Sequence, residues 1–297
     1  MKHLQSAFEG KNAWWRYLLM IFLVGFISYY TIGRLSTVGY LYAVEFFTGE
    51  ELRENQWQWI LGILLFCGLI GGLFLWFLMK PLHNRSPFTL INGTKKIRWK
   101  RFFLAALIWL VFLIIYSVFI FFTTSRSITF SFNPNTFFPL LIICFAVVPV
   151  QAGFEELYSR GYLLQGLGVL TKNRIISIVL VTLLFALLHS FNPEVKSAGF
   201  TLAMFAYLTG SLFFTLIVVL DDGLEMAWGI HTINNIYGFA IWSSDISSVK
   251  SDSLFHIGGS MSYLGVSTMA VLMIICLFVL TKKMKWNWGV LTKKIEV

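Results

Sequence analysis

The chain has 297 residues, of which 57% are hydrophobic and only 12% are charged, and its mean hydropathy is +0.75. Soluble domains carry about 25% charged residues, so this composition excludes an ordinary soluble globular protein. The formal net charge is +9. The basic residues are dispersed over short loops between apolar stretches, which favours contact with anionic lipids and argues against a nucleic-acid-binding surface.

Apolar runs long enough to cross a bilayer, which takes about 17–25 residues, recur along the chain. In chain order the predicted helices cover residues 15–32, 58–79, 102–122, 137–157, 174–191, 199–220, 224–242 and 263–281. The only breaks between the helices around 191–224 are Asn192-Pro193 and Asp221-Asp222-Gly223. We interpret the second break as a solvated turn. The expected fold class is all-α, a polytopic membrane protein with about eight transmembrane helices.

The basic residues predict the orientation of these helices. With both termini cytoplasmic, 17 of the 23 basic residues fall in cytoplasmic segments, chiefly in the N-terminal segment, the loop 80–101 and the tail after residue 281. Arg160 is intramembrane, and five others face outward: Arg34, Arg53, Arg126, Lys196 and Lys250. Cytoplasmic loops of membrane proteins carry such an excess of Lys and Arg. The sequence therefore predicts a multi-pass protein of the cell membrane with both termini in the cytoplasm.

The same loop divides the chain into parts. Residues 1–136 hold the first three helices and the basic loop, and residues 137–242 hold every ionisable residue that lies within an apolar helix. Residues 243–297 form an outer loop, the last helix and a basic tail. The central part is therefore the predicted catalytic core, with an intramembrane cavity.

Six polar or ionisable side chains stand inside apolar helices of this core. A charged side chain at the bilayer centre costs at least about 2.5–3.5 kcal/mol on insertion scales, so each should have a partner or a function. They fall in three clusters, on separate predicted helices: Glu155, Glu156 and Arg160; then His189; then His231 and Asn235.

Helical geometry assigns different roles to the two glutamates. Glu156 and Arg160 are four residues apart and share one helix face, which predicts a buried ion pair. Glu155 is turned about 100° away, so it is the carboxylate free to act as a general base. A purely structural role for both glutamates, locking helices together, is the alternative.

The two histidine clusters complete a possible catalytic site. Phe185 lies four residues before His189, and we expect its ring to form a packing wall beside the imidazole. His231 and Asn235 share one helix face and offer two hydrogen-bond donors, as an oxyanion site requires. Asn234 is a weaker candidate on a different face. Taken singly, either histidine could be an ordinary packing residue.

A metal site is a second interpretation of these residues. Glu155, His189 and His231 could hold a zinc ion with an open position for water. We favour a metal-free mechanism with no cofactor, because Asn235 and Glu156 fit an oxyanion and ion-pair scheme without further ligands. The chain contains neither an H-E-x-x-H zinc-protease helix nor a G-x-S-x-G nucleophile elbow.

The order of the clusters resembles that of a known family. They read E-E-x-x-x-R from Glu155, F-x-x-x-H from Phe185 and H-x-x-x-N from His231, and they resemble the motifs of the CPBP family, which comprises type II CAAX prenyl endopeptidases and bacteriocin-processing or Abi proteins. The resemblance implies an all-helical intramembrane endopeptidase. It implies that Glu155 and His189 activate water, and that His231 and Asn235 bind the oxyanion.

The resemblance also implies the kind of partner. In bacteria the substrates implied are membrane-associated peptide precursors or membrane proteins, and the composition of this chain looks bacterial. Two alternatives stay open. A non-proteolytic member of the same family would act as a bacteriocin immunity factor or regulatory scaffold, and a transporter or proton relay would use the buried charges as an ion path.

Overall fold

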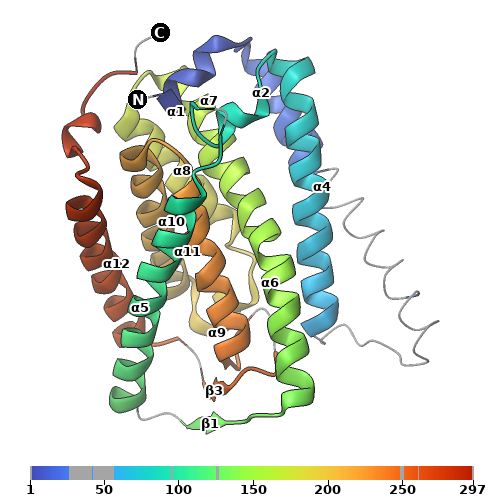
Figure 1. Ribbon diagram of the computed structural model, residues 1–297, viewed down its shortest axis with the longest axis vertical. Helices are drawn as coiled ribbons and strands as arrows, with labels where there is room; N and C mark the ends of the chain where they lie inside the picture. The colour runs from blue at the N-terminus through green and yellow to red at the C-terminus, as the bar shows by residue number, and fades with distance from the viewer. Residues whose placement is uncertain are drawn as a thin grey trace.

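The computed structural model describes residues 2–26, 42, 57–94, 96–124, 127–247, 251–259 and 261–295. In these residues the chain forms a bundle of helices with one small sheet (Figure 1). The predicted all-α fold is confirmed. Arg34, Arg53, Arg126 and Lys250, four of the five basic residues expected to face outward, lie outside the described residues.

The longer helices of the described chain each have at least eight residues. They are α2 (Trp14–Ile21), α4 (Trp57–His83), α5 (Trp99–Thr123), α6 (Pro134–Glu156), α7 (Leu164–Thr171), α8 (Arg174–Leu188), α10 (Phe200–Asp221), α11 (Glu225–Ile236) and α12 (Tyr263–Met284). Shorter segments join them: α1 (Lys2–Gln5), η1 (Ser6–Glu9), η3 (Pro87–Leu90), η4 (Leu157–Leu163), α9 (Pro193–Ala198), η5 (Tyr237–Ile241) and η6 (Trp288–Val290). Of these, η4 and η5 are π-helical.

Four helical stretches of the described chain are long and apolar enough to cross a membrane: Trp99–Thr123, Pro134–Thr171, Phe200–Asp221 and Tyr263–Met284. Shorter apolar helices cover Trp14–Phe26, Gly68–His83 and Arg174–Leu188. The predicted span 224–242 coincides with α11 and η5, which are not among these apolar helices. The chain is therefore a multi-pass, all-helical membrane protein.

The fourth predicted helix, α6, ends at Glu156, within one residue of the predicted bound at 157, but the helical stretch does not end there. It continues through η4 and α7, so that Pro134–Thr171 is one stretch of 38 residues. Arg160, beyond the predicted bound, is fully buried and bonded to neighbouring side chains. Because its charge is satisfied inside the bundle, the helix does not need to end there.

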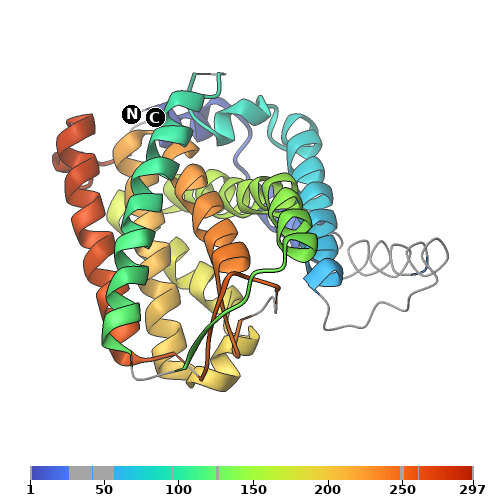
Figure 2. The ribbon, with the colours of Figure 1, turned by 60° about the horizontal axis from the view of Figure 1, so that its bottom comes forward.

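Helix α11 lies at the centre of the bundle. It packs against α5 on one side and α6 on the other, while α10 packs against α8 and α12. Both ribbon views place α12 and α4 at opposite edges (Figures 1 and 2). The helix that carries His231 and Asn235 is therefore enclosed by neighbours.

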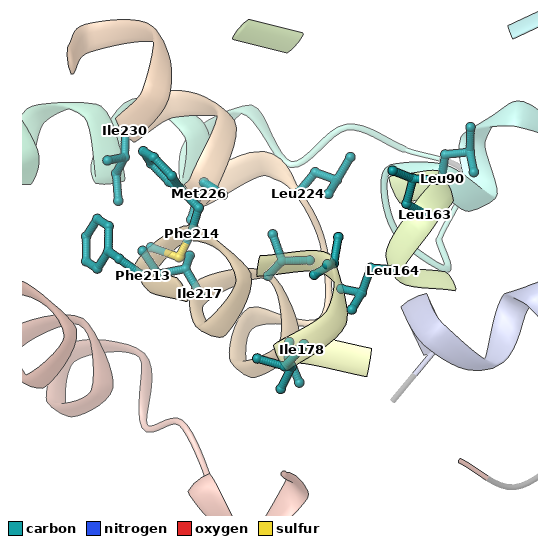
Figure 3. Close-up of a cluster of buried hydrophobic side chains, with 14 of the residues drawn as sticks. Leu90, Leu163, Leu164, Ile178, Phe213, Phe214, Ile217, Leu224, Met226 and Ile230 are labelled. Atoms are coloured by element: carbon teal, nitrogen blue, oxygen red, sulfur yellow. The ribbon is translucent and has the colours of Figure 1, made fainter. Parts of the chain in front are cut away.

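The main hydrophobic cluster joins α8, α10 and α11 to α7, the last part of the helical stretch 134–171. Figure 3 shows side chains from α10, α11, α8 and α7 meeting in one cluster. Phe213, Ile217, Leu164, Ile178 and Ile230 are at most 4% exposed. Burying a side chain of this size stabilises a fold by about 1.5–3 kcal/mol in water, so this cluster fixes the relative positions of the four helices.

The two ends of the bundle differ in character. The termini, α1 and the loop before α5 gather at one end, and the strands lie at the other (Figure 1). The strands β1 (Ile128–Phe130), β3 (Phe255–Ile257) and β2 (Trp242–Ser244) form a sheet in that order. β1 pairs with β3 antiparallel, Thr129 opposite His256, and β2 pairs with β3 parallel, Ser243 opposite His256. The basic segments thus lie together at the end opposite to the sheet.

The sequence predicts a solvated turn between α10 and α11, and this prediction is wrong for Asp221. The Asp221 side chain is fully buried and pairs with Arg98 and Arg101. Glu225 is also buried and pairs with Arg98 at 2.5 Å. Asp222, next in the chain, accepts the backbone N–H groups of residues 2 and 3. These carboxylates fasten the basic loop and the N-terminus to the start of α11.

Candidate active site

Two helices place the candidate residues side by side. Glu155 and Glu156 end α6, just before the π-helical η4, and His231 and Asn235 lie on α11. The helices approach closely at Gly153, where an added Cβ would lie 2.9 Å from the indole nitrogen of Trp228. A larger residue at position 153 would push the helices apart, so this glycine allows the contacts described below.

Glu156 is the centre of a buried ionic cluster. Its Oε1 accepts a hydrogen bond from Nη1 of Arg160 at 3.0 Å, which is the predicted i,i+4 pair. The same oxygen accepts a hydrogen bond from Nδ1 of His231 at 2.8 Å. Both side chains of the ion pair are 0% exposed. Glu156 therefore holds two partners, Arg160 and His231, and the sequence predicted only the first.

Arg160 also contacts the neighbouring helices. Nη2 donates to the hydroxyl of Ser211 at 3.0 Å, and Nε donates to the hydroxyl of Thr215 at 3.4 Å. The guanidinium lies 4.0 Å from the ring centroid of Phe185. A cation over an aromatic face gains more when both are removed from water. Arg160 thus ties α10 and α8 to the Glu156 cluster.

Glu155 differs from its neighbour in exposure. Its side chain is 27% exposed, whereas that of Glu156 is not exposed at all. Oε1 accepts a hydrogen bond from Nε2 of Gln151 at 2.5 Å, and Oε2 lies 3.5 Å from Nε2 of His231. Glu155 is thus a partly exposed carboxylate beside a pair whose charges already cancel.

The hydrogen bonds determine how His231 is oriented. Since the Glu156 carboxylate can only accept, Nδ1 of His231 carries a proton, and Nε2 then faces Glu155. The ring stacks on Phe214 with centroids 5.1 Å apart and planes at 22°. The stacking and the bond to Glu156 thus direct Nε2 of His231 toward Glu155.

Asn235 is joined to the same site through an amide. Its Nδ2 donates to Oε1 of Gln151 at 3.2 Å, and Gln151 in turn donates to Glu155. Asn234 donates to Oδ1 of Asn235 at 3.4 Å and accepts from the indole of Trp109 at 3.1 Å. These bonds restrict the Asn235 amide to one orientation and leave its second N–H available.

His189 lies at the end of α8, in a mostly aromatic environment. Its Nδ1 donates to the carbonyl oxygen of Phe185 at 2.8 Å, so Nε2 is the nitrogen left for chemistry. The ring packs against Phe185 at 4.3 Å and Tyr207 at 5.0 Å between centroids. The Tyr207 hydroxyl accepts a hydrogen bond from Asn192 at 2.9 Å. The aromatic wall predicted at Phe185 is present.

The structure thus brings Glu155, Glu156, His231 and Asn235 together. Hydrogen bonds join His231 to Glu156 and, through Gln151, Asn235 to Glu155, and the 3.5 Å contact between His231 and Glu155 connects these two sets. His189 approaches this group through Phe185, which contacts both His189 and Arg160. Their catalytic roles stay predictions.

Three residues of the site were missed in the sequence analysis: Gln151, Tyr207 and Phe214. Gln151 lies one helical turn before Glu155, and this spacing could have revealed it. Tyr207 and Phe214 come from α10, and no local pattern marks them.

The arrangement of the side chains does not support the zinc interpretation. Within the described part of the chain, no three His, Cys, Asp or Glu side chains are arranged to hold one ion. The zinc ligands considered from sequence, Glu155, His189 and His231, do not form such a group.

Comparison with known proteins identifies the family. The family profile described as Type II CAAX prenyl endopeptidase Rce1-like matches residues 134–237, which include every candidate residue named above. YyaK of Bacillus subtilis (strain 168), described as an uncharacterized protein, is 30% identical over 242 residues, covering 77% of this chain and 78% of YyaK. No solved structure matches the chain. The protein therefore belongs to the family of Rce1-like type II CAAX prenyl endopeptidases.

Proposed function

We propose that the protein is an intramembrane endopeptidase that hydrolyses a peptide bond of a membrane-associated protein or peptide precursor. The observation that carries this proposal is that the two neighbouring glutamates differ in exposure and in their partners. Glu156 is fully buried and pairs with Arg160, while Glu155 is partly exposed and lies 3.5 Å from His231. A water-accessible carboxylate beside a hydrogen-bond donor, within an apolar bundle, suits general-base hydrolysis.

The proposed reaction needs only water and the side chains of this chain. Glu155, assisted by Nε2 of His189, removes a proton from a water molecule as the oxygen bonds to the scissile carbonyl carbon. The N–H groups of His231 and Asn235 donate to the oxyanion that develops, a contribution that is typically worth 10²–10³-fold per donor. The C–N bond then breaks, and the proton held by Glu155 passes to the leaving amine.

The orientation and location of the protein form part of the proposal. We expect a cell-membrane protein with both termini in the cytoplasm, where the basic end of the bundle contacts anionic lipids. Support comes from the gathering of the termini and the loop before α5 at one end (Figure 1). A bacterial peptide precursor, such as a bacteriocin, or a membrane protein is the substrate class we favour.

The activity can be tested with the purified full chain in nanodiscs and a library of proteome-derived peptides, with mass spectrometry of the products. Replacing Glu155 by Gln should lower the number and rate of cleavages by about 10²-fold or more, because proton transfer by a positioned side chain contributes about 10²–10⁴-fold. His256→Gln is the matched control, since His256 lies in the sheet and is partly exposed.

Two results would contradict the proposal. Equal cleavage by the Glu155→Gln variant would remove Glu155 as the base. No cleavage by the wild-type chain would favour a non-proteolytic family member, acting as an immunity factor or a regulatory scaffold.

A further inference from the structure

A cavity of about 510 Å³ lies beside the candidate site, between α5, α10, η5 and α12. Its volume falls in the range of about 300–1,000 Å³ that small-ligand sites occupy. Asn234 is one of its lining residues, but Glu155, His189, His231 and Asn235 are not. The cavity is therefore a neighbour of the candidate catalytic residues, and its contents need a separate explanation.

Asn234 joins the cavity to the proposed oxyanion site. Its amide donates to Asn235 at 3.4 Å and accepts from Trp109 at 3.1 Å, so one side of Asn234 faces the cavity and another contacts the candidate donor. A molecule in the cavity would thus lie against Asn234, which is next to Asn235 in the chain and bonded to its side chain.

Gly238 is the second connection. It lines the cavity and follows Asn235 by three residues, at the start of the π-helical η5. A Cβ added to Gly238 would meet nothing within 4 Å, so the space over this glycine is open. Three residues of helix rise about 4.5 Å, and one residue of an extended peptide spans about 3.3–3.6 Å. The backbone of the substrate residue next to the scissile carbonyl falls about 1 Å short of this rise, and a bulky side chain on that residue covers the remaining distance to the space over Gly238.

The lining defines the chemistry of the occupant. Aliphatic and thioether side chains, among them Leu113, Ile120, Met269 and Met273, are mixed with serine and threonine hydroxyls. Glu194 is the only charged residue in this described lining. Methionine side chains are flexible and adapt to apolar partners of different shapes. The cavity therefore suits a bulky, uncharged side chain.

We propose that this cavity receives a bulky apolar side chain of the peptide substrate next to the scissile bond, and that Gly238 determines this specificity by leaving the cavity open. The inference rests on the proposed endopeptidase function and adds the substrate preference to it. Gly238 takes no part in the chemistry, so changing it should alter the choice of substrate and leave the hydrolysis of suitable peptides intact.

Gly238→Phe tests the proposal because its ring would fill the space that the substrate side chain needs. Gly72→Phe is a matched control, since Gly72 is a helical glycine of α4 with nothing within 4 Å of an added Cβ. Gly238→Ala gives an intermediate change. If Gly238→Phe alters folding, its melting temperature will separate from that of Gly72→Phe, and the alanine variant then carries the comparison.

The first readout is the peptide library. The wild-type chain should favour peptides with Leu, Met or Phe at one position beside the cleaved bond. In Gly238→Phe the ratio of bulky to small residues at that position should fall about 10-fold or more, the scale of discrimination that pocket size provides. Gly72→Phe should keep the wild-type ratio. An unchanged ratio in Gly238→Phe, with cleavage retained, would overturn the inference while leaving the endopeptidase function standing.

The second readout does not depend on cleavage. An apolar peptide carrying benzoylphenylalanine is irradiated with each variant, and adducts are mapped by mass spectrometry. We expect adducts on Met269 or Met273 in the wild type and in Gly72→Phe, and at least a 10-fold loss in Gly238→Phe. If the wild type cleaves no peptide, this loss still supports the cavity as a peptide site, whereas undiminished adducts overturn it. Adducts from a benzophenone phospholipid alone would assign the cavity to lipid and also overturn the inference.

Discussion

Replacing Glu156 by Gln should destabilise the protein far more than replacing Glu155 by Gln. Glu156 and Arg160 are both fully buried, 3.0 Å apart, and Glu156 also holds His231. Gln at position 156 leaves the guanidinium charged and unpaired. Breaking a buried pair in this way costs about 3–5 kcal/mol. For soluble domains of 150–250 residues, Tm falls by about 2–4 °C per kcal/mol, so a decrease of roughly 6–20 °C is expected.

The change at Glu155 should be small by comparison. Gln keeps the size of the side chain and can still accept the hydrogen bond from Gln151, while the 3.5 Å contact with His231 is weakened. The loss of one such interaction costs about 0.5–1.5 kcal/mol. The Glu155→Gln variant should therefore fold with a Tm within a few degrees of wild type while cleavage is lost.

In a Cys67→Ala background, thermal unfolding can be followed with a thiol-reactive dye, because Cys144 and Cys276 are free and buried and will react only when the bundle opens. The double variant Glu156→Gln with Arg160→Met is the control, since it removes both charges and should recover at least half of the lost stability. Equal melting temperatures for the two single variants, or no recovery in the double variant, would refute the reasoning.

Three further predictions follow from contacts away from the site. Burial lowers the pKa of His3, so the unfolded chain binds more protons and stability falls as pH drops below the ordinary value of 6.5. Relative to the intrinsic exchange rate at each pH, the protection of residues 2–9 against hydrogen exchange should therefore be lower at pH 5, and this loss should be smaller in His3→Gln. Glu225→Gln removes the charge of a fully buried carboxylate that pairs with Arg98 and should lower Tm by several degrees. Asp245→Asn, in an exposed pair, should change stability by only about 0–1 kcal/mol. Cysteines placed at Lys96 and Asp252 should react with an impermeant maleimide from opposite sides of the membrane, and labelling of both from one side would reject the topology.

Much of the fold could be predicted because the bilayer imposes a length on each apolar run. Helices α5, α10 and α12 begin and end within about three residues of the predicted bounds. The ion pair between Glu156 and Arg160 could also be predicted, since it lies within one helix and depends only on the spacing of the two residues.

What could not be predicted depends on contacts between helices. The continuation of the fourth helix beyond residue 157 requires Ser211, which satisfies Arg160 from a separate helix. The burial of Asp221 requires Arg98 and Arg101, more than 100 residues earlier in the chain. The second bond of Glu156, to His231, likewise joins α6 to α11. Periodicity within one helix carries no information on which partner a neighbouring helix will supply.

The segment from α11 to the first residue of β2 is anchored at both ends, and this limits the insertions and deletions that the protein can tolerate. Glu225 fixes its start to Arg98, and Trp242, just after η5, begins a strand that pairs with Phe255. Deleting one residue between these two anchors would rotate everything on one side of the deletion by about 100°. His231 would then turn away from Glu156, or the strand would lose its register. The segment 225–242 should therefore tolerate substitutions far better than insertions or deletions, and functional relatives should keep its length.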